Sequence, residues 1–276
     1  MRLRSLLFVP GNRPDRMAKA AATGADALIL DLEDAVAPSA KAAARLAVAE
    51  FLAQPRPCTL FVRVNPLDSG LIDDDLAAVL PARPDGIVLP KAEGGASLAA
   101  LDAKLAGDIM ILPIATETPA AMFALGSYGG VTPRLAGLTW GAEDLPAAIG
   151  ATASREADGS YAAPYQLARS LTLFGAHAAG VAAIETVYPD FRDLDGLAAY
   201  AARGRRDGFS GMMAIHPAQV AVINAAFTPS EAEIDHARAV VALFEANPGA
   251  GALSLNGRMV DAPHLKAARR VLAQAL

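Results

Sequence analysis

The sequence has one cysteine, Cys58, so no disulfide bond can form within the chain. A lone cysteine is typical of proteins kept in a reducing compartment. No hydrophobic run approaches the ~20 residues that a membrane-spanning helix needs. The N-terminal apolar stretch, residues 5–9, is shorter than the roughly 7–15 residues of a signal-peptide core. These absences lead us to expect a cytoplasmic protein with no membrane partner.

Clusters of basic residues are missing as well. The 24 lysines and arginines are spread along the chain, and 29 acidic residues give a net charge of −5. Because nucleic-acid-binding proteins concentrate positive charge, we expect no nucleic-acid partner. The four histidines are scattered and have no cysteine partners, so the ligands of a zinc centre are missing. No Gly-x-Gly-x-x-Gly motif follows the first apolar run, which argues against a dinucleotide-binding fold.

Apolar segments alternate with alanine-rich segments along most of the chain. Most of the apolar segments are continuous rather than alternating, as in parallel strands covered by helices. The eight predicted strands are residues 5–9, 27–32, 59–64, 86–90, 109–116, 135–140, 182–187 and 211–216. Eight strand–helix units over about 220 residues predict an α/β fold, a (β/α)8 TIM barrel. A doubly wound open sheet is the alternative.

The chain continues beyond the last predicted strand. We expect residues 1–227 to form the barrel and residues 228–276 to form a C-terminal helical extension. Residues 228–249 are predicted to be a helix capped by Thr228 or Ser230, and a second helix is expected at the end of the chain. A barrel closes without such a segment, so it could act as a lid, an oligomerisation arm, or both.

Polar residues follow the predicted strands at their carboxyl ends, where barrel enzymes place their chemistry. These residues are Asp31, Glu33, Asp34, Arg63, Asn65, Lys91, Glu117, Glu143, Asp144, Glu185 and His216. No comparable group precedes the strands. The pattern predicts a charged site at one mouth of the barrel.

Several carboxylates converging on one mouth repel one another, so a positive charge is expected among them. Mg²⁺ binds through one or two carboxylates and completes its octahedron with water and substrate oxygens. Glu117 and Asp144 suit this role because they follow neighbouring strands, and each precedes a proline that turns the chain away. Alternatively, Glu117 is an acid that stabilises a helix N-terminus, and the same alternative holds for Glu143.

The other polar residues also have two interpretations each. Arg63 offers a positive charge to the site, or it pairs with Asp31 or Glu33 inside the barrel. We interpret Asp31, Glu33 and Asp34 as residues that support the site rather than act in it. Lys91 is a surface lysine, or it could form a Schiff base, which a metal together with an arginine makes unnecessary.

Seven motifs, in order, resemble those of the citrate lyase β-subunit-like proteins of the HpcH/HpaI aldolase family. They are RSLLFVPGNRPDRMAKA, GADALILDLEDAV, FVRVNP, GIVLPKAE, IATETPAA, LTWGAEDL and AIHPAQVAVINAAFTPS. The resemblance runs from about residue 3 to the end of the chain.

The resemblance implies a TIM-barrel, Mg²⁺-dependent CoA-ester lyase that forms a homotrimer or hexamer. Such enzymes cleave or form malyl-CoA, citramalyl-CoA or citryl thioesters, so the implied partners are a CoA thioester and a small oxo acid. It implies that Glu117 and Asp144 bind the metal, with Glu117 thereby also in contact with substrate. Arg63 would bind the substrate carboxylate and offset charge during catalysis. Arg13 and Lys19 would lie near the CoA phosphates.

The C-terminal sequence LNGRMVDAPHLKAARRVL resembles the lid of malyl-CoA and citramalyl-CoA lyases. The resemblance implies that Asp261 acts in acid–base catalysis at a neighbouring subunit's site. Asp261 also suits the N-cap of the final helix, and the two roles are compatible. Other functions stay open: a citrate lyase β subunit acting on an acyl-carrier-protein thioester, a thioesterase, a barrel that binds CoA esters without turnover, and a pyruvate aldolase that uses no CoA.

Overall fold

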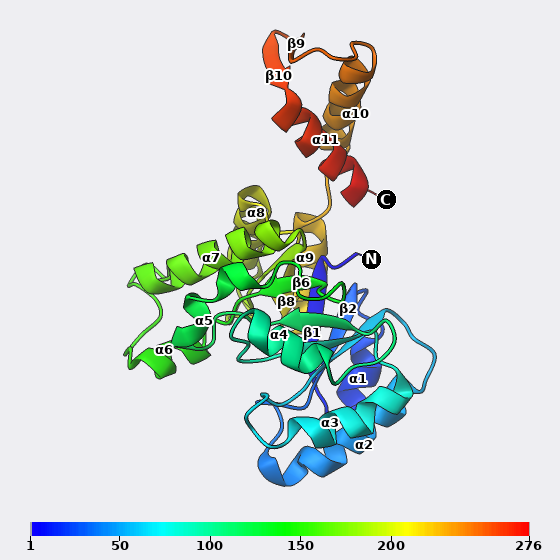
Figure 1. The fold of residues 1–276 in the computed structure, drawn as a ribbon, viewed down its shortest axis with the longest axis vertical. Coiled ribbons are helices and arrows are strands. Elements are labelled where there is room, and N and C mark those ends of the chain that lie inside the picture. Colours follow the sequence, from blue (N-terminus) through cyan, green and yellow to red (C-terminus); the bar gives the residue numbers. More distant parts are fainter. Residues whose placement is uncertain (1, 276) are drawn as a thin grey trace. The chain divides into compact units, whose positions relative to one another are not determined.

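The computed structural model describes residues 2–275, which divide into two compact units. The first unit comprises residues 3–224, and the second begins at Ala225. Figure 1 shows the first unit in blue to yellow and the second in orange to red. Within residues 2–275, no helix is both long and apolar enough to cross a membrane.

The first unit is built on eight strands that pair in parallel in the order β5-β4-β3-β2-β1-β8-β7-β6. The strands are β1 Ser5–Pro10, β2 Ala27–Asp31, β3 Thr59–Arg63, β4 Gly86–Leu89, β5 Met110–Pro113, β6 Gly137–Thr139, β7 Ala182–Glu185 and β8 Gly211–Ala214. All eight predicted strands are present, and the prediction of a (β/α)8 barrel is confirmed.

The ring closes between β5 and β6 through isolated bridges rather than a continuous ladder. Ile111 bridges Leu135, and Ile114 bridges Thr139, both in parallel. The Ala115 amide also donates to the Thr139 carbonyl at 2.8 Å. The strands that precede Glu117 and Asp144 therefore meet at a lightly bonded seam.

Helices surround the barrel strands, as Figure 1 shows for the first unit. They are α1 Pro14–Ala20, α2 Lys41–Leu52, α3 Ile72–Val79, α4 Gly95–Asp102, α5 Pro119–Met122, α6 Asp144–Ile149, α7 Ala163–Ala179, α8 Leu194–Asp207 and α9 Pro217–Ala226. Alanine and leucine are frequent in them, which favours helix formation. Two helices, α6 and α7, lie between β6 and β7.

The barrel interior is filled by alternate strand residues. Leu6, Ile29, Phe61, Ile184 and Met213 belong to one buried apolar cluster to which most of the strands contribute. Successive side chains on a strand point to opposite faces. A residue next to one of these interior positions therefore faces the helices.

The second unit contains two helices and a hairpin, so it is not purely helical. Helix α10, Glu231–Glu245, begins with a capping box in which Ser230 and Glu233 bond reciprocally. Strands β9, Ala252–Leu255, and β10, Arg258–Asp261, pair antiparallel and lead into α11, Ala262–Gln274. Asn256 and Gly257 join the strands with positive φ, as a tight hairpin turn requires.

Candidate active site

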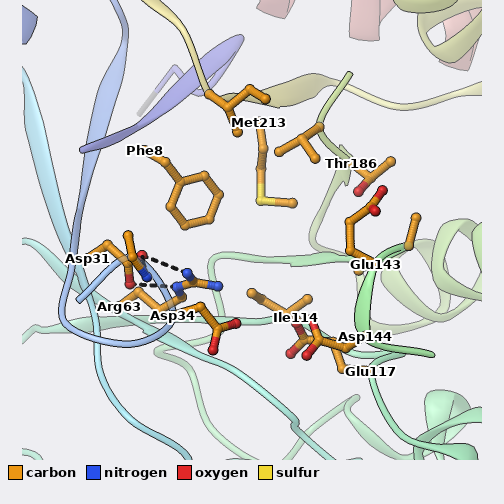
Figure 2. A pocket seen from close by; sticks show the side chains of 15 residues that line it. Phe8, Asp31, Asp34, Arg63, Ile114, Glu117, Glu143, Asp144, Thr186 and Met213 are labelled. Atoms are coloured by element: carbon orange, nitrogen blue, oxygen red, sulfur yellow. Dashed lines mark hydrogen bonds and ion pairs between the residues drawn. The ribbon is translucent and has the colours of Figure 1, made fainter. Parts of the chain in front are cut away.

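A cavity of about 370 Å³ opens at the carboxyl ends of the barrel strands. Its lining combines apolar side chains with acids and one arginine. The residues that line it are Phe8, Asp31, Asp34, Ala35, Arg63, Ile114, Glu117, Gly141, Ala142, Glu143, Asp144, Thr186, Val187, Met213 and Ile215. Figure 2 shows Arg63, Glu117 and Asp144 around this cavity. The cavity thus collects charged residues predicted from four different strand ends.

Arg63, the last residue of β3, is held by two buried acids. Its Nε and Nη2 donate to the two Asp31 carboxylate oxygens at 2.7 and 2.6 Å. Its Nη1 lies 3.0 Å from Glu33 Oε2, and its guanidinium lies 4.9 Å from the Phe8 ring centre. Asp31 also accepts the backbone N–H groups of Glu33 and Ala35. The guanidinium therefore has a fixed orientation at the cavity wall.

Glu117 follows β5 and is almost completely buried, with 3% of its surface exposed. Its Oε2 accepts the Lys91 backbone N–H at 2.6 Å. Burial raises the pKa of Glu117 to about 8, and repulsion from Asp144 contributes. A Cβ atom at Gly141 would lie 2.7 Å from the Glu117 side chain, so only glycine leaves room for it. Glu117 thus sits in a tight recess beside a second acid and lacks a full counter-charge.

Asp144 is the first residue of α6, and its carboxylate is about one third exposed at the cavity. The Lys91 Nζ lies 3.4 Å from Asp144 and donates to Glu33 at 2.6 Å. Burial opposes the charge on Lys91, but the hydrogen bond to Glu33 and the nearby acids outweigh it and raise the Lys91 pKa. Burial raises the pKa of Glu33, although Arg63 and Lys91 act in the opposite direction.

The backbone of Lys91 lies in the left-handed region, with φ of 51°. Few residues other than glycine adopt this conformation, and it directs both the amide and the ammonium of Lys91 to acids of the site. The sequence placed Lys91 after the fourth strand but gave no sign of this geometry.

Thr116 links the two strand ends that carry the acids. Its hydroxyl accepts the Gly141 N–H at 3.1 Å and donates to the Gly141 carbonyl at 3.2 Å. Glu117 is the next residue after Thr116, and Asp144 follows Gly141 by three residues. The separation of the two acids is therefore fixed in part by this side chain.

Three of the polar residues expected at the mouth lie elsewhere. Glu185 faces the outer helices and pairs with Arg169, because Ile184 before it points into the barrel. Asn65 is buried and donates to a helix-borne acid, Asp75, at 2.7 Å. His216 is exposed, and its ring stacks on Phe191 with centroids 4.8 Å apart. None of these three side chains lines the cavity.

Asp34 is exposed and lines the cavity, whereas Glu33 supports it from behind through Arg63 and Lys91. Arg13 and Lys19 belong to the surface around α1. Arg13 precedes this helix and pairs with Asp15 at 2.9 Å. Lys19 is exposed in its last turn, and neither basic residue lines the cavity.

Asp261 belongs to the second unit, where it ends β10 and is the N-cap residue of α11. Its Oδ1 lies 2.5 Å from His264 Nδ1, and its own N–H points to the same nitrogen at 3.3 Å. The hydrogen bond with His264 lowers the pKa of Asp261. The carboxylate is therefore held in its charged form.

Among residues 2–275, no group of three or more His, Cys, Asp or Glu side chains is arranged to hold a metal ion. Glu117 and Asp144 form a pair rather than such a group. Two carboxylates suit Mg²⁺, which retains water or substrate ligands, and do not suit zinc. The recess at Gly141 and the raised Glu117 pKa fit a carboxylate pair that accepts a cation.

A charged cavity at the carboxyl ends of eight parallel strands is the arrangement of a TIM-barrel enzyme. Residues 4–217 match the family described as HpcH/HpaI aldolase/citrate lyase. The chain belongs to this family.

Curated and structurally solved relatives cover almost the whole chain. A "citrate lyase subunit beta-like protein" from Deinococcus radiodurans is 39% identical, over 98% of this chain and 96% of its own. A "(3S)-malyl-CoA thioesterase" from Cereibacter sphaeroides is 37% identical, over 99% of this chain and 94% of its own. The crystal structure of CitE from Mycobacterium tuberculosis with magnesium, acetoacetate and coenzyme A is similar, with a TM-score of 0.84, 36% identity, and 99% and 97% coverage.

Proposed function

We propose that the protein is a Mg²⁺-dependent carbon–carbon lyase that cleaves or forms 3-hydroxyacyl-CoA thioesters of the malyl-CoA, citramalyl-CoA or citryl-CoA type. The observation that carries the proposal is the pair Glu117 and Asp144 beside Arg63 in one barrel-mouth cavity. The magnesium and coenzyme A of the similar CitE structure support this choice of metal and substrate class.

In this proposal Glu117 and Asp144 hold the magnesium ion through their carboxylates. Bound there, Mg²⁺ supplies a Lewis acid that polarises and orients the oxygens of the oxo acid. Ionising Glu117 is unfavourable without a cation, because burial and Asp144 disfavour its charge. Lys91 meets part of that need through its backbone N–H and its ammonium.

Arg63 would bind the substrate carboxylate and offset negative charge that develops in the transition state. A guanidinium carries five N–H donors. Asp31 and Glu33 engage Nε, Nη2 and Nη1 once each, which leaves donors for a substrate. Asp31 and Glu33 therefore orient Arg63 and leave donors free for a substrate, and the Phe8 ring packs against the guanidinium at 4.9 Å.

The remaining assignments extend the same proposal. Arg13 and Lys19, both exposed, would bind the CoA phosphates. Residues 228–276 would form a lid in which Asp261 moves the proton to or from the acyl α-carbon of a neighbouring subunit's substrate. We propose a cytoplasmic homo-oligomer, a trimer or hexamer. The exposed Phe123 and Phe174, at 94% and 65%, are apolar surface that an oligomer would cover.

A low Asp261 pKa matters for this role. His264 stabilises the charged carboxylate, so Asp261 is ready to accept a proton at neutral pH but is a weak base. Contact with a desolvated substrate would strengthen it.

A second candidate is hydrolysis of the thioester after condensation, which the similarity to a malyl-CoA thioesterase favours. Lyase and thioesterase activities would share the same metal and Arg63. They differ in whether water reaches the thioester carbonyl before the product leaves.

The direct test is to incubate the protein with Mg²⁺, acetyl-CoA or propionyl-CoA, and glyoxylate, pyruvate or oxaloacetate, and to identify products by mass spectrometry. We expect a hydroxyacyl-CoA product that is lost in Asp261→Asn and on removing magnesium with EDTA. Free hydroxy acid with released CoA would identify the thioesterase. No product from any pair, with CoA esters still bound, would reject the lyase in favour of a non-catalytic barrel or a carrier-protein substrate.

A further inference from the structure

A buried polar cluster lies on the helix-facing side of β7, between this strand and helices α7 and α8. Its centre is Glu185, which is 0% exposed. One carboxylate oxygen accepts the Trp140 indole N–H at 2.5 Å, the Tyr200 hydroxyl at 3.1 Å and the Thr186 N–H at 3.0 Å. The other accepts Arg169 Nε at 2.7 Å. The carboxylate is thus fully engaged and does not reach the cavity.

Two of these four donors belong to chain segments that build the cavity. Thr186 follows Glu185 and lines the cavity. Trp140 directly follows β6, and Asp144 lies four residues further along the chain. Trp140 is fully buried, and its ring also packs edge-on against Tyr161 with centroids 5.1 Å apart. The indole is therefore the fixed point from which the 141–144 loop departs.

The loop has a second attachment on its other side. Thr116 holds Gly141 from the segment that follows β5, whereas Glu185 holds Trp140 from β7. Side chains that orient metal ligands from behind commonly change metal affinity when they are altered. A buried carboxylate is costly to place, and an apolar contact would suffice to pack Trp140. The charge on Glu185 is therefore better explained by a role in fixing the position of Trp140.

We propose that Glu185 is a positioning residue, which sets the place of the Asp144 carboxylate by anchoring Trp140. The inference rests on the proposed function, because Asp144 is taken there as a metal ligand. It adds that the relative position of the two proposed metal ligands, Glu117 and Asp144, is set by two anchors. These anchors are Thr116, which follows β5, and Glu185 in β7.

Trp140→Phe tests the anchor because it removes the N–H and keeps an aromatic ring. Tyr200→Phe is the matched control: it removes another hydrogen bond to the same Glu185 oxygen, but from α8 rather than from the loop. Mg²⁺ affinity is measured by calorimetry on purified full-length protein, and hydrogen exchange of residues 141–147 is measured without metal.

We expect Trp140→Phe to weaken Mg²⁺ binding about 10-fold, the lower end of the range for such supporting residues. We also expect it to accelerate exchange in the loop, while Tyr200→Phe stays within about 2-fold of wild type in affinity. Turnover of Trp140→Phe should recover at high Mg²⁺, and the circular dichroism of its metal-free form should match that of the wild type, which a general loss of folding would not allow.

Unchanged affinity and exchange in Trp140→Phe would overturn the positioning role. Equal weakening by both variants would also overturn it, because it would indicate general loosening of the cluster. Glu185→Gln gives a second measurement: the single tryptophan should shift its fluorescence and Mg²⁺ binding should weaken. Wild-type protein that binds no Mg²⁺ would reject the proposed function itself, and loop exchange would then decide the anchor alone.

Discussion

On the β2–β3 side of the cavity, Arg63 lies 2.6 to 3.0 Å from Asp31 and Glu33, and Lys91 also pairs with Glu33, so two buried acids face two positive charges within the protein. On the β5–β6 side, Glu117 and Asp144 repel each other, and burial raises the pKa of Glu117 to about 8. Both sides bury charge near the same cavity. The first side has its counter-charges within the protein, whereas the second would be stabilised by a positive charge from outside.

The two sides therefore have different consequences: the first fixes the orientation of Arg63, and the second favours binding of a cation. Charged side chains that are hydrogen-bonded to one another keep a fixed orientation without a bound ligand. An unbalanced acid costs stability and becomes favourable when a cation binds. Variants on the two sides should therefore differ in whether they affect folding, metal binding, or both.

The largest effect is expected from Glu117→Gln, which keeps the shape of the side chain and removes its charge. Because a proposed metal ligand is lost, Mg²⁺ affinity and Mg²⁺-dependent turnover should fall by more than about 100-fold, beyond the range for supporting residues. Calorimetry and the mass-spectrometric assay measure both. Glu143→Gln is the matched control, since Glu143 also lines the cavity but is exposed. Similar losses in both variants would contradict a specific role for Glu117.

Arg63→Met should remove the counter-charge of two buried acids and destabilise the fold by about 3–5 kcal/mol. Arg45→Met provides a close control. Arg45 is as buried as Arg63, at 13% and 12% side-chain exposure, and pairs with a buried acid, Asp75, outside the cavity. Chemical denaturation should show losses in both variants.

Only Arg63→Met should also lose affinity for the oxo acid. KM for the oxo acid, measured at a temperature where both variants are folded, separates the two. An unchanged KM in Arg63→Met would mean that Arg63 supports the fold alone.

The smallest effect concerns pH. A folded-state pKa near 8 for Glu117 means that folding stability is unaffected below its usual pKa of about 4.5, and falls as pH rises from there towards 8. By pH 7 the metal-free protein should have lost about 3 kcal/mol relative to Glu117→Gln. The unfolding free energies of the two proteins in EDTA, compared from pH 5 to 8, measure this.

Mg²⁺ should reverse that loss in the wild-type protein, by about 2.7 kcal/mol at 100 times its Kd. Glu117→Gln should show little response to Mg²⁺. Parallel pH profiles of unfolding free energy for the two proteins would contradict a raised pKa of Glu117.

The sequence predicts the barrel because eight apolar runs, most of them continuous, alternate with alanine-rich segments. The fifth strand was predicted at 109–116 but ends at Pro113 in the structure. Ile114 contacts β6 through an isolated bridge instead of a ladder. Runs of apolar residues indicate burial but do not reveal where the hydrogen-bond ladder between two strands ends.

The place of Glu117 and Asp144 at the cavity is predictable because both follow the carboxyl ends of neighbouring strands. The prediction of Glu185 at the mouth is wrong, because side chains alternate along β7 and its carboxylate pairs with Arg169 on the helix side. With Ile184 inside the barrel, Glu185 has to face the helices and Thr186 the cavity. The left-handed backbone of Lys91 could not be foreseen, since it opposes the intrinsic preference of lysine.

The seam between β5 and β6 has a mechanical consequence. Continuous ladders join the other neighbouring strands of the ring, whereas isolated bridges join these two. Glu117 follows β5 and Asp144 follows β6, so an ion held by both carboxylates would connect the two strands across this seam. Removing this ion with a chelator would then destabilise the barrel at the contact between β5 and β6, and these two strands would separate before the other strand pairs.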